Sequence, residues 1–578
     1  MTVRWDERCG GSAALADVPE AGCDVVVLSV ADRPGSPAGE AEALLAECAR
    51  VVRAGGWLFV YGSPRVLPDW GVRLVGPDGV AGAWIFKYWI ALELNAAPRG
   101  DFLQPAHQGL LMFLRKAAGS TRQPRFRLNT DTVRVPHQFC AACGKHLKDW
   151  GGKKHLMHPL GTALSDVWRD LPRLELRSHA APAVVLERIR ALTLQENWHG
   201  LHVISPVARG VSRPMEVDGR LRAEAVESTV AAGDLEFDQV IEADCVEYLE
   251  RLNRMHPGGV FDLVFADPPY NLAKSYDAYA DARAEREYLE WCERWLDGAV
   301  RALRPGGSLF VLNLPKWALH HAVFLNARIE FRHWIAWDAL SDPRGKLMPA
   351  HYALLYYTKP GGAPVFNYSP LGAPPDPECV PPPDAPKYCL RPACVRQRKR
   401  LGDDAKVELS DIWFDVHRIR HKRDRDAHPC QLPEKLLERI VRLASPPGGR
   451  VFDPFCGAGT TAIVAARLGR RFIVVDSDAN YVRITRAKLA AMRQHSDLFG
   501  VAAVPRERTR RPPRAFRKKD VETRLQALAR QLGRVPTEAE IQEADPALLE
   551  AIDRLYPYRS AALKRCRLAL APAGQTAG

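Results

Sequence analysis

The feature that most constrains the fold of this chain is an internal repeat. PAHQGLLMFLRK at 105–116 returns as PAHYALLYYTK at 349–359, an offset of 349 − 105 = 244 residues. SDVW at 165–168 returns as SDIW at 410–413, an offset of 410 − 165 = 245 residues. Because chance matches do not keep both their order and their spacing, we interpret the chain as a tandem duplication of one unit of about 245 residues.

Each repeat alternates strand-like and helix-like segments. In the first repeat, 23–30 and 57–62 are apolar runs typical of buried strands, and 40–53 has the pattern of a helix. The same scaffold returns later, since ALRPGGSLFVLN at 302–313 matches VVRAGGWLFVYG at 51–62. This alternation predicts an α/β fold in each half of the chain.

Composition places the chain among large soluble proteins. Its 578 residues suffice for several domains, and 47% of them are hydrophobic and 26% charged. No apolar run is long enough to span a bilayer and the start, MTVRWDERCGG, is not a signal peptide, so we expect a cytoplasmic protein without membrane contact. Thirteen scattered cysteines argue against a disulfide framework. The net charge of +13 favours a polyanionic partner.

The stretch FDLVFADPPYN at 261–271 carries the most distinctive chemistry of the second repeat. Its apolar run ends at Asp267, and two prolines prevent the strand from continuing. We therefore expect Asp267 at the carboxyl edge of a sheet, with the Tyr270 ring just past the turn. There a carboxylate and a backbone carbonyl can accept the two hydrogens of an exocyclic base amine, while an aromatic ring stacks on the extruded base. The alternative is a plain Pro-Pro turn after a buried strand.

A glycine-rich segment, RVFDPFCGAGTT at 450–461, predicts a second binding element. Gly457 and Gly459 allow close backbone approach, and the helix that follows offers free N–H groups to an anion. Asp476 ends the next strand, 476 − 453 = 23 residues beyond Asp453, where an acid can hold ribose hydroxyls. The loop is neither GxGxxG nor a P-loop, so a nucleoside with a small carboxylate tail fits best. A structural strand–glycine–helix corner is the alternative.

Together these segments resemble the DNA amino-methyltransferases that modify adenine N6 or cytosine N4. The resemblance rests on DPPY at 267–270, on HPCQLPEKLLERIVRLASPPG at 428–448 and on VFDPFCGAGTTAIVAARLGRRFIVVDSDANY at 451–481. The order of these motifs is that of the permuted β-class. It implies an α/β fold class with two Rossmann-like, S-adenosylmethionine-dependent methyltransferase-type domains in tandem, the first degenerate, each built on a mostly parallel seven-stranded sheet. A small helical domain follows them.

The resemblance also implies roles for individual residues. The base would be held and stacked by Asp267, Pro268, Pro269 and Tyr270. The cofactor S-adenosylmethionine would be lined by Asp453, Phe455, Gly457, Gly459, Thr460, Asp476 at the ribose and Asp244 near the adenine. Residues 428–434 would close over the pocket, and DPPY rather than SPPY leans toward adenine. Methyl transfer itself would need no metal.

The first repeat has the residues of the predicted strands and helices but lacks the polar residues of this site. It has SVADRPG where the second repeat has ADPPYN, and VISPVARGVS at 203–212 where the second has VFDPFCGAGTT. We therefore predict that the first half is a degenerate copy that replaces the second subunit of a dimer, giving a pseudo-dimer within one chain. The alternative is an independent active enzyme with unusual motifs.

We expect four segments: 1–230, a degenerate methyltransferase-like domain with a CxxC insert; 231–500, the catalytic domain; 501–519, a basic linker; and 520–578, a helical tail. A target-recognition insert is expected at about 360–427, which is Pro-rich and then basic. Its predicted DNA-binding residues are Arg396, Arg398, Lys399, Arg400, Arg420, Lys422 and Arg423. The alternative is a solvated charged loop. The tail resembles small helical repeats linked to DNA-binding nucleases, and a packing or dimerisation module is the alternative.

Two cysteine pairs occupy matching places in the repeats. They are Cys140 with Cys143, and Cys389 with Cys394. We hypothesise that all four bind one zinc ion that bridges the halves, since CxxC is good ligand spacing and CxxxxC is weaker. Two other interpretations stay open: simple structural cysteines, and separate sites completed by His137, His146 and Cys379.

The function predicted from these motifs is site-specific methylation of an adenine or cytosine amine in double-stranded DNA. A restriction or defence protein would be a natural partner. Two alternatives are methylation of RNA or of a protein amide, and a non-enzymatic DNA-binding subunit of a modification complex. The recognition sequence and the choice of base do not follow from the sequence.

Overall fold

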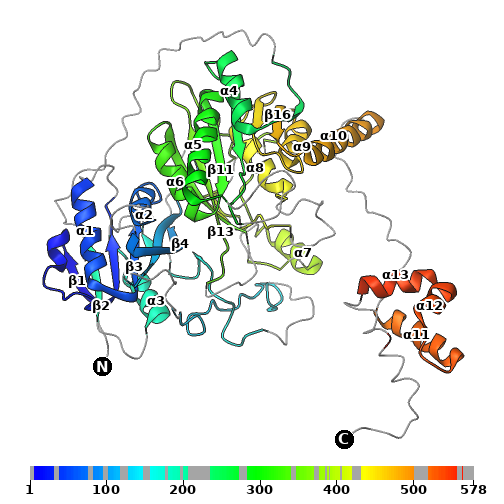
Figure 1. The fold of residues 1–578 in the computed structure, drawn as a ribbon, viewed down its shortest axis with the longest axis horizontal. Coiled ribbons are helices and arrows are strands. Elements are labelled where there is room, and N and C mark those ends of the chain that lie inside the picture. The colour runs from blue at the N-terminus through cyan, green and yellow to red at the C-terminus, as the bar shows by residue number, and fades with distance from the viewer. Residues whose placement is uncertain are drawn as a thin grey trace, which may run out of the picture. The chain divides into compact units, whose positions relative to one another are not determined.

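We describe the protein from a computed structural model (Figure 1), in which the chain forms two compact units, Met1–Leu489 and Ala490–Gly578. The structure describes residues 5–31, 38–75, 82–95, 102–117, 126, 128–147, 157–172, 174–175, 180–194, 200–205, 235–272, 283–339, 347–369, 376–384, 387–389, 391–403, 406–419, 431–499, 518–555 and 563.

The first sheet is built from residues before position 206. Its strands are β1 (Trp5–Cys9), β2 (Cys23–Ser29), β3 (Val52–Gly62), β4 (Trp84–Asn95), β5 (His107–Arg115), β6 (Val167–Trp168), β7 (Leu174–Glu175) and β8 (Leu201–Ser205). In space they follow the order β1-β8-β2-β3-β5-β4-β6, and β7 pairs with β4. β5 is antiparallel to β3 and β4, and the other pairs are parallel.

The second sheet repeats this plan. Its strands are β9 (Gln239–Glu242), β10 (Phe261–Ala266), β11 (Leu303–Asn313), β12 (Glu330–Asp338), β13 (His351–Thr358), β14 (Ile412–Trp413), β15 (Arg450–Asp453) and β16 (Arg471–Asp476). Their order is β14-β12-β13-β11-β10-β15-β16-β9, with β13 antiparallel to both of its neighbours. The family resemblance implied seven strands. The eighth is β14, a two-residue strand that the SDIW segment adds beside β12.

Helices cover the strands of both sheets. They are α1 (Ala38–Val51), α2 (Leu67–Val75), α3 (Ala183–Thr193), α4 (Cys245–Met255), α5 (Glu285–Ala302), α6 (Pro315–Asn326), α7 (Pro392–Leu401), α8 (Glu434–Ala444), α9 (Thr460–Arg467) and α10 (Ala479–Phe499). Neighbouring helices α4, α5 and α6 pack in sequence, and α8 packs on α9 (Figure 1). β10 buries all six of its residues, as expected of a central parallel strand covered on both faces.

The shared strand order also shows where the halves differ. From β2 to β6 and from β10 to β14, the two sheets have the same arrangement. Beyond β8, which occupies the place of β15, the first sheet continues directly to β1, and no described strand corresponds to β16. A duplication would produce the common part. The degenerate character of the first copy and the boundary near 230 stay predictions, since residues 206–234 lie outside the described part.

One ion pair is built twice. Asp262 accepts a hydrogen bond from the Arg304 side chain at 2.6 Å and another from the Arg450 N–H at 2.7 Å, which joins β10 to β11 and β15. Asp24 of the first half likewise pairs with Arg53 and accepts the Gly200 N–H. The single acid that interrupts each apolar strand is therefore a structural tie between three strands.

The two halves share a core within the first compact unit. Trp89 of β4 stacks on Trp334 of β12, with ring centroids 3.7 Å apart and both side chains fully buried. These residues are 334 − 89 = 245 positions apart, the repeat spacing. Nearby, α2 packs on α6, and Gly71 lies so close to Leu319 that an added Cβ would require the leucine side chain to move. Equivalent elements thus meet each other, as in a dimer with two-fold symmetry.

The SDVW and SDIW segments exchange hydrogen bonds between the halves. Asp166 accepts the N–H of Ala350 at 2.8 Å, and Asp411 accepts the N–H of Ala106 at 2.7 Å. Each donor and each acceptor has its counterpart in the other half, since 350 − 106 = 244 and 411 − 166 = 245. Such reciprocal contacts are the mark of an isologous interface, here formed inside one chain.

The two exchanged carboxyl groups are held differently. Burial raises the pKa of Asp166 to about 7. Burial also raises the pKa of Asp411, but the His107 and His333 rings, whose nitrogens lie 3.0 and 3.4 Å from its oxygens, lower it by more. The pKa of Asp411 is therefore about 2. Asp411 is therefore an ionised, paired group, and Asp166 is a buried carboxyl that resists ionisation.

The second compact unit contains the helical tail. Its described helices, besides the end of α10, are α11 (Lys518–Leu532), α12 (Glu538–Ala544) and α13 (Pro546–Leu555). Val521, Leu525, Ile541 and Leu548 are among the buried residues of its own small core. The expected linker at 501–519 lies almost wholly outside the described residues. Nowhere in the described part is a helix both long and apolar enough to cross a bilayer.

The contrast between the two aspartates gives a test of the interface. Asp411→Asn should lower the free energy of unfolding by about 2 kcal/mol at neutral pH, because a charge-assisted buried bond is lost. Asp166→Asn should change it by no more than about 1 kcal/mol near pH 4, where the natural carboxyl is neutral too, because its amide oxygen keeps the N–H bonds of Ala350 and His351.

The pH dependence of Asp166→Asn follows from the same pKa. A carboxyl whose folded pKa lies above its unfolded value loses stability as the pH rises between those two values. The variant should therefore gain stability relative to the natural chain from about pH 4 to about pH 7. Urea unfolding at several pH values measures both effects, and equal losses for the two variants at every pH would contradict this account.

Candidate active site

A cleft lies where β10 and β15 end side by side. Leu263 pairs with Val451 in parallel, so the residues after both strands come to the same edge of the sheet. Asp267 and Asp453, 453 − 267 = 186 positions apart in the chain, both line this cleft. The cleft is open to solvent and is lined by residues that follow both strands. The structure thus brings the two predicted sequence segments into one site.

The DPPY corner is fixed by hydrogen bonds from three aromatic side chains. The Tyr270 hydroxyl donates to Asp267 at 2.6 Å. The Tyr288 hydroxyl donates to the Pro269 carbonyl at 2.6 Å, and the Trp317 indole donates to the Tyr270 carbonyl at 2.8 Å. Tyr270, expected as a stacking ring, is only 7% exposed and also orients the carboxylate. The sequence did not indicate this second contact.

A pair of residues closes the loop that follows the corner. Asn271 has a left-handed backbone, with φ of 52°, and its side chain accepts the Arg283 N–H at 2.9 Å and donates to the Arg283 carbonyl at 3.0 Å. The Arg283 guanidinium lies 5.1 Å from the centre of the Trp291 ring, and both residues line the cleft. Sequence reasoning missed them, although Trp291 and Trp295 on α5 have the i, i+4 spacing of one helix face.

The glycine-rich segment makes a tight bend between β15 and α9. Gly457 and Gly459 have φ of 47° and 81°, a region that favours glycine. A Cβ on Gly459 would collide with Thr485, whose hydroxyl donates to the Gly457 carbonyl at 3.2 Å. The bend therefore brings backbone close to the cleft, and Thr460 begins α9 at its edge.

Asp453 is a buried carboxyl beneath this bend. It accepts the Phe455 N–H at 2.8 Å and the Thr461 hydroxyl at 2.5 Å. Burial nevertheless raises its pKa to about 7, and the nearby Asp476 charge acts in the same direction. A cationic group bound beside it would favour the ionised form and be favoured by it.

Two acids of the next strand end face the same cleft. Asp476 accepts the Gly457 N–H at 2.8 Å and the Asp478 N–H at 2.9 Å, and burial raises its pKa. Asp478 accepts the Asn480 N–H through one oxygen, while its buried Oδ2 has no hydrogen-bond partner in the described part of the chain. A buried acceptor left open beside a cleft fits a ligand that brings hydroxyl or amine hydrogens.

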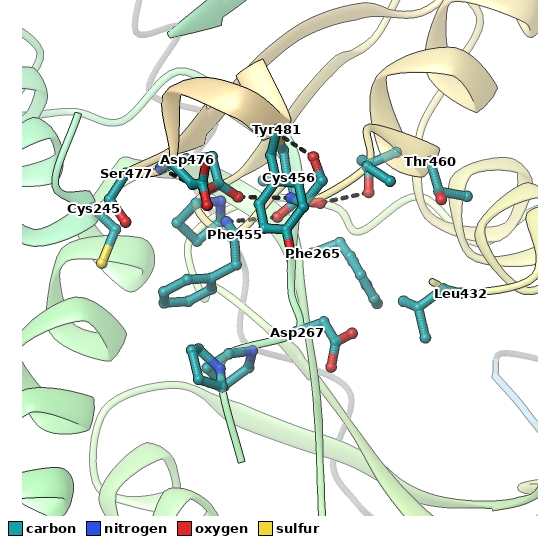
Figure 2. A pocket seen from close by; sticks show the side chains of 18 of the residues that line it. Cys245, Phe265, Asp267, Leu432, Phe455, Cys456, Thr460, Asp476, Ser477 and Tyr481 are labelled. Carbon is teal, nitrogen blue, oxygen red and sulfur yellow. Dashed lines mark hydrogen bonds between the residues drawn. The ribbon is translucent and has the colours of Figure 1, made fainter. Parts of the chain in front are cut away.

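Figure 2 shows the Asp267 and Asp476 carboxylates on different sides of the cleft, with Phe455 between them. The Phe455 ring meets the edges of Trp291 and Trp295, at centroid distances of 5.7 and 5.1 Å. The cleft therefore has two polar ends and an aromatic wall between them.

Asp244 has a structural role besides its place in the cleft. Its Oδ1 caps α4 by accepting the N–H groups of Val246 and Glu247 at 2.8 and 3.1 Å. Of the segment expected to close over the pocket, Gln431 and Leu432 line the cleft. Residues 428–430 lie outside the described part.

The predicted DNA-binding residues divide into two groups. Arg396, Lys399 and Arg400 are exposed on α7, whereas Arg398 is only 17% exposed and pairs with Asp384 at 3.5 Å. The remaining predicted contacts, Arg420, Lys422 and Arg423, lie outside the described residues. All four predicted zinc ligands come together, away from the cleft.

Comparison with known proteins identifies relatives of the second half. A family described as DNA methylase, the N6/N4 methyltransferases, matches residues 261–487. The type II methyltransferase M.BamHI of Bacillus amyloliquefaciens is 35% identical over 247 residues, which are 41% of this chain and 54% of that protein. M1.MboII of Moraxella bovis is 29% identical over 259 residues, 43% of this chain and 95% of that protein. The chain thus spans about half the length of the first of these relatives.

Solved structures also match part of this chain. A structure of an M1.HpyAVI–SAM complex matches 43% of this chain and 98% of its own, at 20% identity and a TM-score of 0.29. PvuII DNA methyltransferase, described as cytosine-N4-specific, matches 43% of this chain and 84% of its own, at 18% identity and a TM-score of 0.30.

Proposed function

We propose that this chain, whose residues 261–487 match the N6/N4 DNA methylase family, transfers a methyl group from S-adenosylmethionine to the exocyclic amine of an adenine or cytosine in double-stranded DNA. The observation that carries the proposal is the meeting of the DPPY corner and the glycine bend in one cleft. A cytoplasmic site of action is part of this proposal.

The donor end of the cleft fits the charges of S-adenosylmethionine. When bound, this molecule supplies an electrophilic methyl carbon on a sulfonium. Asp453 would face the ammonium of its methionyl part, and the Gly457 bend would approach the same amino-acid part. Asp476 and the open Oδ2 of Asp478 would accept hydrogen bonds from its ribose hydroxyls. Phe455 would pack against it and exclude water.

At the base end, Asp267 and a carbonyl of the proline corner would accept the two amine hydrogens. This pulls the nitrogen toward tetrahedral geometry and frees its lone pair for in-line attack. The hydrogen bond from Tyr270 fixes the carboxylate in place beforehand, so little reorganisation is needed during the reaction. Extruding the base costs a few kcal/mol, which stacking and edge hydrogen bonds offset.

The first half would act as the second subunit of a dimer. The stacked tryptophans and the exchanged aspartates place equivalent surfaces of the halves together, which is how a two-fold dimer is built. The exposed basic side chains of α7 would contact the phosphate backbone of DNA. A chain with its own pseudo-dimer needs no second copy to grip DNA.

A labelled-methyl assay on DNA, RNA and protein tests the proposal. Label is expected in DNA, in N6-methyladenine or N4-methylcytosine. Label in RNA or in a protein amide would instead support a related methyltransferase. A chain that binds DNA but neither binds S-adenosylmethionine nor transfers label would support a non-enzymatic subunit.

Asp267→Asn keeps the size of the side chain and removes its charge. The rate of methyl transfer should fall by about 10²- to 10³-fold, the usual effect of removing one preorganised polar partner, while donor binding stays unchanged. Tyr270→Phe should cause a smaller loss, because the ring remains. Glu293→Gln, on the exposed face of α5, is the control. Full activity of Asp267→Asn in single-turnover kinetics would refute the assigned role.

Donor affinity should depend on the charge of Asp453. Because burial places its pKa at about 7, the affinity should rise with pH up to that value, by at most about tenfold per pH unit, and then level off. Asp453→Asn keeps a hydrogen-bonding amide and should flatten the profile. Asp166→Asn is the matched control, since Asp166 has a similar pKa but does not line the cleft. Calorimetry at several pH values measures this, and a steep profile in Asp453→Asn would contradict it.

Exposed charges on α7 should control the salt dependence of DNA binding. Combined substitution of Arg396, Lys399 and Arg400 by Ala should weaken binding and reduce the slope of log K against log salt by about 2 to 3, if each neutralises one phosphate. Arg254→Ala, at the end of α4 that is remote from the cleft, is the control. An unchanged slope in fluorescence anisotropy titrations would remove α7 from the interface.

A further inference from the structure

We propose that Cys140, Cys143, Cys389 and Cys394 bind one structural zinc ion that joins the two halves of the chain. Their four sulfur atoms all lie within 4.8 Å of one another. Two of the ligands come from the first half and two from the second, although the pairs are almost 250 positions apart, 389 − 140 = 249. The packing of the two halves against each other, and not closeness in the sequence, brings the four cysteines together.

The spacing of the sulfurs suits a tetrahedral zinc ion. Zinc binds cysteine sulfur at about 2.3 Å, so the sulfurs of a tetrahedral site are about 3.8 Å apart. The Cys143 and Cys389 sulfurs are 3.8 Å apart. A small inward movement of the others, from at most 4.8 Å, completes the geometry. Sulfurs in a disulfide are instead about 2 Å apart, and the described cysteines are all free.

The backbone around the first pair has the form of a metal-binding knuckle. Gly144 follows Cys143 with a left-handed φ of 61°, and its N–H donates to the Cys140 carbonyl at 2.9 Å. The tight turn brings the Cys140 and Cys143 sulfurs close enough to bind one ion.

The second pair completes this environment. The Cys389 N–H donates to the Cys140 sulfur at 3.3 Å, across the two halves. The Arg391 guanidinium lies 3.2 Å from the Cys389 sulfur and 3.6 Å from that of Cys143. Four thiolates around a divalent zinc carry a net charge of −2, and this arginine offsets part of it. Cys140, Cys389 and Cys394 are each at most 4% exposed, so burial protects the site.

The residues kept open as other ligands lie differently. His137 binds the His158 carbonyl through Nε2 at 2.9 Å and packs edge-to-face on His146. In the described part of the chain, the four-cysteine cluster is the group of metal-ligating side chains that converges, and neither histidine nor Cys379 belongs to it. The set is therefore all-sulfur, which selects zinc over hard cations.

A zinc ion here would fix α7 to the first half. Cys394 lies in the first turn of α7, and its side chain is buried. The Ala141 N–H of the first half donates to the Lys387 carbonyl at 3.1 Å, just before this helix. The ion would therefore hold α7, whose exposed basic side chains are the proposed DNA contacts, against the first half. The site itself does not depend on the proposed function.

Metal analysis of the full-length chain, purified without chelator, tests the proposal. About one zinc per chain is expected, and Cys140→Ser should lose it. Cys9→Ser, an exposed cysteine outside the cluster, should keep it. Equal zinc in the two variants, or a natural chain free of zinc after growth with zinc, would overturn the proposal, as would mass-spectrometric detection of disulfides among these four cysteines.

A second measurement guards against a variant that fails to fold. The natural chain, stripped of zinc and loaded with cobalt, should show the visible absorption of tetrahedral cobalt bound to sulfur. In Cys143→Ser, which alters the most open ligand, that spectrum should shift. An octahedral cobalt spectrum in the natural chain would contradict the site. Neither readout requires methyl transfer, so failure here leaves the proposed function untouched.

Discussion

The parallel pairing of β10 with β15 is the interaction on which the site depends. It places the ends of two strands from distant parts of the chain at one sheet edge, so that Asp267 and the Gly457 bend share a cleft. Asp262 reinforces this pairing, because one carboxylate binds Arg304 and the Arg450 N–H together. If that alignment shifted by one residue, the polar groups after each strand would point to the opposite face of the sheet.

The first half shares part of this scaffold, and the described strands of the two halves differ beyond β8. Asp24 repeats the structural tie, and the strand order up to β8 is the same, yet the described first sheet passes directly from β8 to β1. The strand, glycine bend and helix that hold the acids of the donor end have no described counterpart there. What the first half keeps is its packing surface. Through Trp89 and Asp166 it supports the second half as a partner subunit would.

Much of this was predictable from local patterns. The end of β10 just before Asp267 follows from the two prolines, and the bend between β15 and α9 follows from the glycine-rich segment. The repeat spacing indicated that the halves match. The contacts that required three dimensions were not predictable. The hydrogen bond of Tyr270 to Asp267, the Asn271–Arg283 pair and the open oxygen of Asp478 depend on side-chain directions. The ion pair of Arg398 with Asp384 likewise depends on packing and could not be predicted from the sequence.

The central claim is that one cleft presents a sulfonium methyl group to an amine held at the proline corner. A crystal structure of the chain with the selenium analogue of S-adenosylmethionine tests it most directly, because anomalous scattering locates the methyl-bearing atom. The account predicts a selenium peak in the cleft beside Phe455, with its methyl group directed toward Asp267. A peak outside this cleft, or a methyl group directed away from Asp267, would contradict it.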